Sequence, residues 1–241
     1  CPLSICCAMS QGYIGHDLQI AIRDELAQRG LVKEVSTLLT HVVVDQADQA
    51  FQNPTKPIGT YVSREEADRL TAERGFTYAE DAGRGLRRVV PSPQPVSIVE
   101  LPAIRDLVQT GQIVIACGGG GIPVVRTEEG NLEGVEAIID KDFASCRLAQ
   151  ELEADFLVIL TAVEKVAIHF GTPQEKWLDS MTPDEARTYI AEGHFAPGSM
   201  LPKVEAALQF AESGQGRSAL ITLLEKAKDG IQGKTGTRIG S

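Results

Sequence analysis

The sequence predicts an α/β fold in which helices cover a mostly parallel, open β-sheet. Apolar runs with the length and β-branching of buried strands recur along the chain, for example at residues 113–117. The run at residues 155–163 is apolar on both faces, which is typical of parallel strands covered by helices. Segments with helical spacing of apolar residues separate these runs, and such alternation is typical of layered α/β domains.

Residues 1–45 are predicted to contribute one helix and one strand to the core. Apolar residues at helical spacing, beginning with Leu18, predict an amphipathic helix over residues 17–29 that ends at Gly30. The apolar run over residues 35–45 predicts a single strand. This part of the chain is therefore interpreted as the first section of the core.

Residues 46–95 differ in composition and are predicted to form a subdomain that protrudes from the core. The segment is polar, rich in proline and glycine, and contains one short predicted helix. Ser63 and Glu66 have the spacing of a capping box at the start of that helix. We interpret the segment as an insertion between two parts of the core.

The α/β alternation resumes in residues 96–241, which are predicted to complete the core. Gly130 and Asn131 mark the turn of a predicted hairpin. Thr182 and Glu185 form the capping signal of one helix. The remaining strands are predicted at residues 113–117, 155–163 and 218–222. The helices are predicted at residues 101–110, 140–152, 182–193, 200–212 and 223–228.

Composition argues against several classes of function. The formal net charge is -10 and the lysines and arginines form no cluster, which disfavours a nucleic-acid or anionic-membrane surface. No apolar run approaches the ~20 residues of a membrane span, and no leader resembles a signal peptide. The five cysteines lack metal-ligand spacing, which predicts reduced thiols in a cytoplasmic protein and no protein-bound metal.

Two patterns resemble nucleotide-binding motifs but lack essential residues. The run GIQGKTG ends like a P-loop, yet the first glycine of that motif would fall on Lys228. Gly118 and Gly120 fit the dinucleotide fingerprint, but Pro123 stands where the third glycine belongs. We therefore interpret GIQGKTG as a turn, and a Rossmann dehydrogenase is disfavoured.

A cluster of four glycines directly follows the strand predicted at residues 113–117. Glycine is entropically costly to order, so such a cluster needs a structural or functional reason. One interpretation is a loop that requires turns with positive φ. The other is a cradle of backbone N–H groups that binds an anion such as phosphate. The glycines alone leave both interpretations open.

Three lysines lie in surroundings that favour contact with an anion. Lys56 stands in a loop that is stiffened by a proline on either side. Lys141 and Lys203 each fall in the first turn of a predicted helix, where a cation is unfavourable unless an anion shares the site. Each lysine alone also fits a solvated surface. Together with the glycines they predict a phosphate site at the carboxyl ends of the strands, where Gly118 and Thr161 both fall.

Motifs along nearly the whole chain resemble those of carbamate kinases, which belong to the amino acid kinase superfamily. The motifs that carry the resemblance, in order, are MSQGYIG, NPTKPIG, EDAGRG, VVPSPQP, IVELPAI, CGGGGIPVV, IDKDFAS, LTAVEKVAI, KWLDSMT, EGHFAPGSMLPKVEAA and GKTGT. Their number and order make the resemblance far more specific than a single glycine pattern.

The resemblance implies reversible phosphoryl transfer between carbamoyl phosphate and ADP, which gives carbamate and ATP. It implies a three-layer αβα sandwich on a mainly parallel open sheet, with a protruding subdomain over the active site. It also implies a cytoplasmic homodimer that uses Mg²⁺ bound through the nucleotide phosphates and generates ATP in arginine catabolism, through the arginine deiminase pathway. Phosphoryl transfer of this kind needs positioning and charge neutralisation rather than a protein nucleophile.

The resemblance also implies roles for individual residues. Lys141 and Lys203 correspond to lysines that contact phosphate, and Asp142 corresponds to the aspartate that orients them. Lys56 corresponds to the lysine that the subdomain delivers. The phosphoryl and carbamate site is expected at Gly118, Gly119, Gly120 and Gly121. The nucleotide is expected at Thr161, Ala162, Val163, Lys165, Ala196, Pro197, Gly198, Ser199 and Met200.

The chain departs from the family pattern at its beginning. It starts at Cys1, just before the MSQGYIG motif, and the family's GGNA-type and GNGPQVG-type turns are not found. We therefore expect that N-terminal strands of the family's sheet are missing from this chain. Missing central strands expose apolar faces and unpaired backbone groups, so the polypeptide made alone is expected to be inactive and poorly soluble.

Two alternatives to a carbamate kinase are considered. A non-catalytic, truncated kinase-like protein would act through association with a partner, but the retained lysines and Asp142 argue against long drift. A sister kinase would phosphorylate a carboxylate such as acetylglutamate or glutamate, but the dense carbamate-kinase motifs disfavour it.

Overall fold

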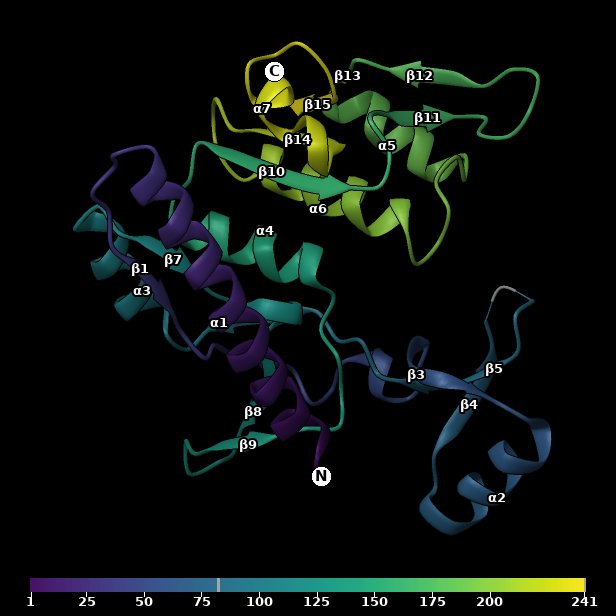
Figure 1. Ribbon diagram of the computed structural model, residues 1–241. Coiled ribbons are helices and arrows are strands. Elements are labelled where there is room, and N and C mark those ends of the chain that lie inside the picture. Colours follow the sequence, from purple (N-terminus) through teal and green to yellow (C-terminus); the bar gives the residue numbers. More distant parts are fainter. Residues whose placement is uncertain (82, 241) are drawn as a thin grey trace. The chain divides into compact units, whose positions relative to one another are not determined.

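Helices and strands alternate along the chain in the computed structural model, as the sequence predicts (Figure 1). The structure describes residues 1–81 and 83–240. The chain divides into two compact units, Cys1–Ala144 and Ser145–Ser241. Parallel strand pairs occur in both units, next to antiparallel ones. The predicted α/β class with parallel sheet is therefore confirmed.

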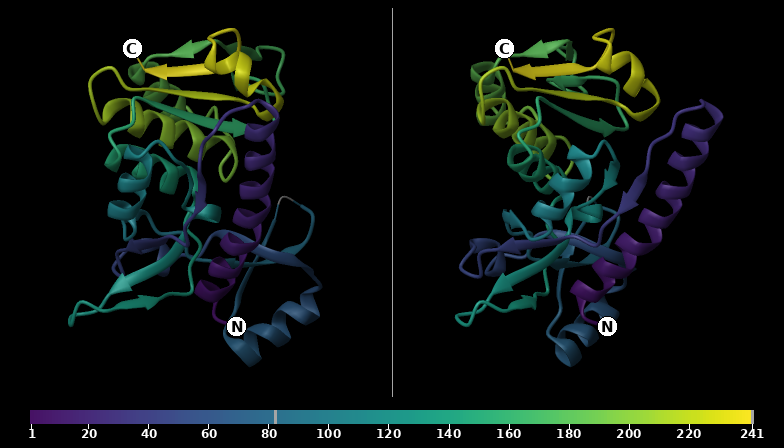
Figure 2. Two further views of the ribbon diagram at one scale, coloured as in Figure 1. Left: turned by 60° about the vertical axis from the view of Figure 1, so that its left-hand side comes forward. Right: turned by 90° about the vertical axis from the view of Figure 1, so that its left-hand side faces the viewer.

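The first unit begins with a helix that is longer than predicted. Helix α1 covers Leu3–Gln28, since no proline interrupts the chain after Pro2. The helix packs against the strand that follows it, as Figure 2 shows, and its buried residues are Gln11 and Gly15. The predicted amphipathic stripe is wrong at Leu18, which is 45% exposed. A glycine and an amide, rather than a leucine stripe, are buried in this helix, and Cys7 and Ala8 pack against the core cluster of the first unit.

The strand predicted over residues 35–45 is two strands instead. Strand β1 covers Val35–Thr37 and pairs in parallel with β7, Ile113–Ile115. Strand β2 covers His41–Val44 and pairs in parallel with β8, Ile122–Arg126. The prediction of one strand is wrong because the chain changes partners between β1 and β2. Strand β7 is also shorter than its predicted range.

Strands β2 and β8 are the middle of a four-stranded mixed sheet, β6-β2-β8-β9. The outer strands β6, Pro95–Ile98, and β9, Leu132–Gly134, run antiparallel to their neighbours. Strands β8 and β9 form the hairpin that was predicted to turn near Gly130. The buried side chains of this sheet include Val42, Val44, Ile98 and Val124.

A separate antiparallel sheet, β3-β5-β4, lies within the segment that was predicted to protrude. Its strands are β3, Lys56–Val62, β4, Thr77–Glu80, and β5, Leu86–Val90. The predicted short helix is α2, Arg64–Arg74, where the Ser63 hydroxyl accepts a hydrogen bond from the Glu66 backbone amide at 3.2 Å. The three strands were not predicted, since most side chains of β3 and β4 are exposed or only partly buried, and only β5 has several buried apolar residues, Leu86, Val89 and Val90.

Two helices and two short 3-10 helices complete the first unit. Helix α3, Leu101–Gln109, has Pro102 in its first turn, as predicted. Helix α4, Lys141–Glu151, begins in this unit and lies within its predicted range. The 3-10 helices are η1, Gln49–Phe51, and η2, Gly118–Gly120.

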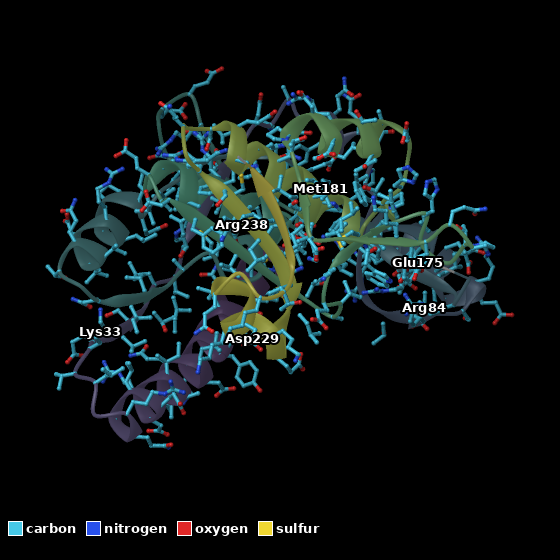
Figure 3. The ribbon with its side chains drawn as sticks, turned by 90° about the horizontal axis from the view of Figure 1, so that it is seen from above. Lys33, Arg84, Glu175, Met181, Asp229 and Arg238 are labelled. Atoms are coloured by element: carbon cyan, nitrogen blue, oxygen red, sulfur yellow. The ribbon has the colours of Figure 1, made fainter. Side chains whose placement is uncertain are left out.

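The second unit contains the four-stranded sheet β10-β14-β15-β13. Strand β10, Phe156–Thr161, pairs in parallel with β14, Ser218–Leu223, and both lie where strands were predicted. Strand β15, Thr237–Gly240, was not predicted, and it runs antiparallel to β14 and parallel to β13, Ser180–Met181. Figure 3 shows Met181 and Arg238 on these two neighbouring strands.

Three helices pack around this sheet. Helix α6, Met200–Glu212, has its predicted bounds and contacts β10, β14 and β15. Helix α5, Pro183–Ala191, starts with the predicted capping box of Thr182 and Glu185. The helix predicted at residues 223–228 is partly wrong, because Leu223 still belongs to β14. It is followed by the 3-10 helix η3, Leu224–Lys226, and the short helix α7, Ala227–Ile231.

Helices α6 and α7 lie on opposite sides of β14 (Figure 1). A short hairpin, β11, Val166–Ile168, with β12, Lys176–Leu178, completes the second unit. Within the described part of the chain, no helix has the length and apolar character needed to span a bilayer.

Candidate functional site

The glycine cluster forms a tight turn that only glycine adopts at low cost. The turn begins at Cys117, which has a positive φ of 54°. Gly119, Gly120 and Gly121 continue with φ of 67°, 105° and 90°. Side chains rarely tolerate this region, because the β-carbon approaches the backbone. The interpretation of the glycine cluster as a loop that requires positive φ is therefore confirmed.

The glycines of this turn differ in what surrounds them. A β-carbon on Gly120 would lie 2.1 Å from the carbonyl oxygen of Ile139, and one on Gly121 would lie 2.2 Å from Cγ2 of Val42. These two glycines thus allow close packing inside the first unit. Gly119 is exposed and faces open space, with nothing within 4 Å of its β-carbon position. Its backbone is the part of the turn that a ligand can approach.

The turn packs against the start of α4. The β-carbon position of Gly120 lies 3.4 Å from the backbone nitrogen of Lys141. Lys141 is exposed, whereas the next residue, Asp142, is 6% exposed. The structure therefore brings together Lys141, Asp142 and the glycine turn, three features that the sequence predicted for one phosphate site.

Lys56 reaches the same place from β3. Its Nζ donates a hydrogen bond to Oδ2 of Asp140 at 2.6 Å, and the Lys56 and Asp140 side chains are 28% and 11% exposed. The other Asp140 oxygen, Oδ1, accepts a hydrogen bond from the backbone nitrogen of Asp142 at 2.9 Å. Asp140 thus joins the lysine of the predicted subdomain to the first turn of α4.

The electrostatics of Asp140 favour a carboxylate. Burial alone would raise the pKa of Asp140, but the hydrogen bonds from Lys56 and from the Asp142 backbone amide outweigh it. The positive charges of Lys56 and Lys141 act in the same direction, so the pKa lies below its ordinary value. At neutral pH the site therefore holds an ionised aspartate that is hydrogen-bonded to Lys56 and lies near Lys141.

A small cavity of about 50 Å³ lies between α1 and the glycine turn. Gly118 and Gly119 form part of its wall, and Gln11 and Gly15 line it from α1. The open side of the turn thus borders a cavity of the first unit.

The second unit has its own cavity at the carboxyl ends of β10 and β14. Its volume is about 430 Å³, within the range of small-molecule sites. The residues that line it are Leu160, Thr161, Ala162, Leu223, Leu224 and Glu225. Two predicted nucleotide residues, Thr161 and Ala162, therefore border a cavity at the edge where parallel sheets bind ligands.

The segment after Ala162 is fixed by neighbours from the C-terminal part of the chain. Lys165 Nζ donates a hydrogen bond to Oδ1 of Asp179 at 2.5 Å, and this bond raises the pKa of Lys165. The Glu164 carboxylate accepts a hydrogen bond from the Thr235 hydroxyl. Thr235 belongs to the GKTG run, so the turn predicted there has a structural role beside the predicted nucleotide segment.

The segment before α6 holds the other predicted nucleotide residues, Ala196, Pro197, Gly198, Ser199 and Met200. Gly198 has a φ of 74°, and the side chain of Ser199, at the N-cap position, makes no capping hydrogen bond. The first N–H groups of α6 are thus not capped by Ser199, which favours an anion there. Lys203 lies half-buried in the first turn of α6. Val163 lies half-buried just after β10.

Sequence reasoning missed several residues of these sites. Asp140 was not singled out, although its place before Lys141 in the IDKDFAS motif was a usable signal. The residues after β14 were missed, although parallel pairing brings the ends of β10 and β14 to one edge. Gln11 lies in the MSQGYIG motif, but its contact with Thr40 could not be predicted, because that contact depends on the packing of α1.

Comparison with known proteins agrees with the motifs. The amino acid kinase family model matches residues 10–222. The carbamate kinase-like protein YqeA of Escherichia coli K12 is 61% identical, over 99% of this chain and 76% of its own length. The carbamate kinase of Clostridium perfringens is 54% identical over the same shares.

A solved structure of a relative agrees as well. The carbamate kinase of Giardia lamblia bound to AMP-PNP superposes with a TM-score of 0.90 at 43% identity, covering 99% of this chain and 75% of its own. The resemblance inferred from the motifs is confirmed, and the chain belongs to the carbamate kinases of the amino acid kinase family.

Proposed function

We propose that this protein is a carbamate kinase that catalyses reversible phosphoryl transfer between carbamoyl phosphate and ADP. The observation that carries the proposal is the joining of Lys56, Asp140 and the start of α4 beside the open glycine turn. The carbamate kinase of Clostridium perfringens, at 54% identity, supports the substrate class, as does the carbamate kinase-like protein YqeA, at 61% identity.

The proposed chemistry is the displacement of carbamate from phosphorus. A terminal phosphate oxygen of ADP forms a bond to the phosphorus while the bond from phosphorus to the carbamate oxygen breaks. Carbamate leaves with the electron pair, and ATP is formed. Charge spreads over the equatorial phosphoryl oxygens during transfer, so fixed cations and backbone donors supply most of the catalysis.

In the first unit, Lys141 and Lys56 supply positive charge, and the N–H of Gly119 supplies an open backbone donor. Asp140 holds Lys56 through a hydrogen bond, and Asp142 is proposed to orient Lys141 and Lys203. The family resemblance supports Lys203 as a further phosphate contact. The substrate-binding turn is proposed to include Gly118, Gly119, Gly120 and Gly121.

In the second unit, the cavity beside Thr161 and Ala162 is proposed to bind ADP or ATP. Its volume and its position at the strand ends support this assignment, as does the AMP-PNP bound to the Giardia lamblia relative. The further proposed nucleotide contacts are Val163, Lys165, Ala196, Pro197, Gly198, Ser199 and Met200.

Mg²⁺ is proposed to enter with the nucleotide. No group of three or more His, Cys, Asp or Glu side chains within residues 1–81 and 83–240 is arranged to hold a metal ion. Phosphate oxygens are ligands that Mg²⁺ prefers, and the bound ion would neutralise phosphate charge.

Four further features are proposed from the family resemblance. These are ATP generation in arginine catabolism through the arginine deiminase pathway, a homodimer, a cytoplasmic location, and the division into residues 1–45, 46–95 and 96–241. The separate sheet β3-β5-β4 supports the assignment of residues 46–95 as a subdomain.

A comparison of three acceptors, each in a separate reaction, tests the proposed substrate. The protein, purified at the length that its gene encodes, is incubated with ATP, Mg²⁺ and either carbamate, N-acetylglutamate or glutamate, and ADP formation is measured. We expect ADP with carbamate at a rate at least about 100-fold above the other acceptors, as for sites that pair with a specific substrate. A faster reaction with either amino acid would overturn the assignment. A folded protein that is inactive with all three would favour a non-catalytic role.

A further inference from the structure

A buried amide on α1 clamps the break between β1 and β2. Gln11 is 4% exposed. Its Oε1 accepts a hydrogen bond from the Thr40 backbone nitrogen at 2.8 Å, and its Nε2 donates one to the Thr40 carbonyl oxygen at 3.2 Å. One side chain thus bonds to both backbone groups of Thr40. The Thr40 carbonyl oxygen also accepts a hydrogen bond from the Ile122 backbone nitrogen of β8 at 2.8 Å.

Thr40 passes this constraint on to the glycine turn. Its side chain is completely buried, and its hydroxyl accepts a hydrogen bond from the Cys117 backbone nitrogen at 3.0 Å. The same hydroxyl donates to the Leu38 carbonyl oxygen at 3.0 Å. The hydroxyl therefore uses its proton and a lone pair to connect the strand break to Cys117, the residue that starts the turn.

Cys117 needs such a constraint. It is a buried residue other than glycine with a positive φ, 54°, and such residues persist only where the surroundings hold them. Gln11 also packs directly under the turn, since its Cγ lies 3.3 Å from the β-carbon position of Gly118. The path from α1 to the open backbone of Gly119 is thus continuous.

We propose that Gln11 and Thr40 are positioning residues for phosphoryl transfer, and we call this pair with the Cys117 amide the turn latch. The turn latch holds Cys117 in its left-handed conformation, so that the following glycines present their backbone to the phosphoryl group. The inference rests on the proposed function for its kinetic consequence. Its structural part, the dependence of the turn on the latch, stands apart from that function.

The first test compares Thr40→Val with Thr40→Ser in the protein at its gene-encoded length. Valine keeps the shape but removes the hydroxyl, whereas serine keeps the hydroxyl. We expect Thr40→Val to lower kcat for ATP formation on the order of 10- to 100-fold, as misplacement of a reacting group does, with KM for ADP unchanged. Thr40→Ser is expected to restore most of kcat. Equal kcat in Thr40→Val and wild type would overturn the proposal.

A second pair of variants tests the amide. Gln11→Met removes both hydrogen bonds at similar size, and Gln28→Met is its control, because Gln28 is an exposed residue of the same helix. We expect kcat to fall in Gln11→Met only. A parallel loss in the control would assign the effect to α1 in general and contradict the turn latch.

A readout without activity separates the two claims. In protein labelled with ¹⁵N-glycine, the amide signals of the turn in each variant are compared by NMR with those of the wild type. We expect these signals to move from their wild-type positions in Thr40→Val and Gln11→Met but not in Thr40→Ser. If the wild type forms no ATP, the proposed function fails while these signals still decide the latch. Unchanged turn signals in both disruptive variants would overturn it.

Discussion

Gly119 and Gly120 are neighbours in one turn, but the structure constrains them differently. Gly120 has a backbone carbonyl 2.1 Å from its β-carbon position, whereas Gly119 faces open space. Both have positive φ, so any side chain adds strain at either position. At Gly120 a side chain would also clash inside the first unit, whereas at Gly119 it would occupy the space where substrate is proposed to bind.

This contrast predicts that Gly119→Val loses activity, whereas Gly120→Val loses the fold. Gly119→Val is expected to abolish ATP formation while lowering the free energy of unfolding by about 1–3 kcal/mol, the cost of a strained backbone conformation. Gly120→Val is expected to prevent cooperative folding. Thermal melts and ATP assays on the two variants check both statements. Near-normal turnover in Gly119→Val would exclude the turn from the substrate site.

Asp140 links charge to stability in a way that depends on pH. Its pKa is held below the ordinary value of 3.8, mainly by Lys56 and the Asp142 amide against the opposing effect of burial. A lowered pKa means that the folded state favours the carboxylate. The stabilisation is therefore present above pH 3.8 and is lost as the pH falls through the lower, folded-state pKa.

Asp140→Asn is expected to lower the free energy of unfolding at pH 7 by about 1–3 kcal/mol, because the half-buried Lys56 loses its charged partner. The difference from wild type should shrink as the pH falls below 3.8. Urea unfolding at several pH values measures it. Asp229→Asn is the control, because its pair with Lys234 is exposed and 3.7 Å long. A difference that is constant with pH would contradict the ion-pair account.

At the scale of elements, residue spacing and cap residues predicted those helix ends that depend on residues close in sequence. The bounds of α6 and the capping box of α5 follow from spacing and from cap residues close in sequence. The break after β1 could not be predicted, because it depends on β1 and β2 pairing with different strands, β7 and β8, that lie far along the chain. Strand β15 was missed for a similar reason, since its short, glycine-flanked run gains its conformation from pairing with β13 and β14.

The α5 capping box gives a prediction at this scale. Thr182→Ala removes a hydroxyl that accepts from the Glu185 backbone nitrogen, and is expected to cost about 1 kcal/mol of stability. Thr188→Ala in the same helix is the control, since the Thr188 hydroxyl bonds the Asp184 carbonyl and contributes little. Unfolding in denaturant compares the two. Equal losses would show that the cap is not what stabilises the start of α5.

At the scale of the whole molecule, the predicted site residues are shared between two compact units. Phosphate chemistry and the family motifs together grouped Lys56, Lys141, Asp142 and the glycine turn into one predicted site, and the structure places these residues together in the first unit. Sequence reasoning did not identify Asp140 as their connection, since an aspartate before a helix has many ordinary roles. The side-chain geometry of the folded first unit was needed to assign it.

The most direct measurement of the central claim is ATP formation from carbamoyl phosphate, ADP and Mg²⁺. It compares wild type with Lys141→Ala and with the control Lys33→Ala, both at the gene-encoded length. Lys33 is an exposed lysine of the first unit whose Nζ bonds the Gly111 carbonyl (Figure 3). We predict ATP formation by wild type and Lys33→Ala, and a loss of at least about 100-fold in Lys141→Ala, the scale of a transition-state contact. Full activity in Lys141→Ala, or none in a folded wild type, would contradict the account.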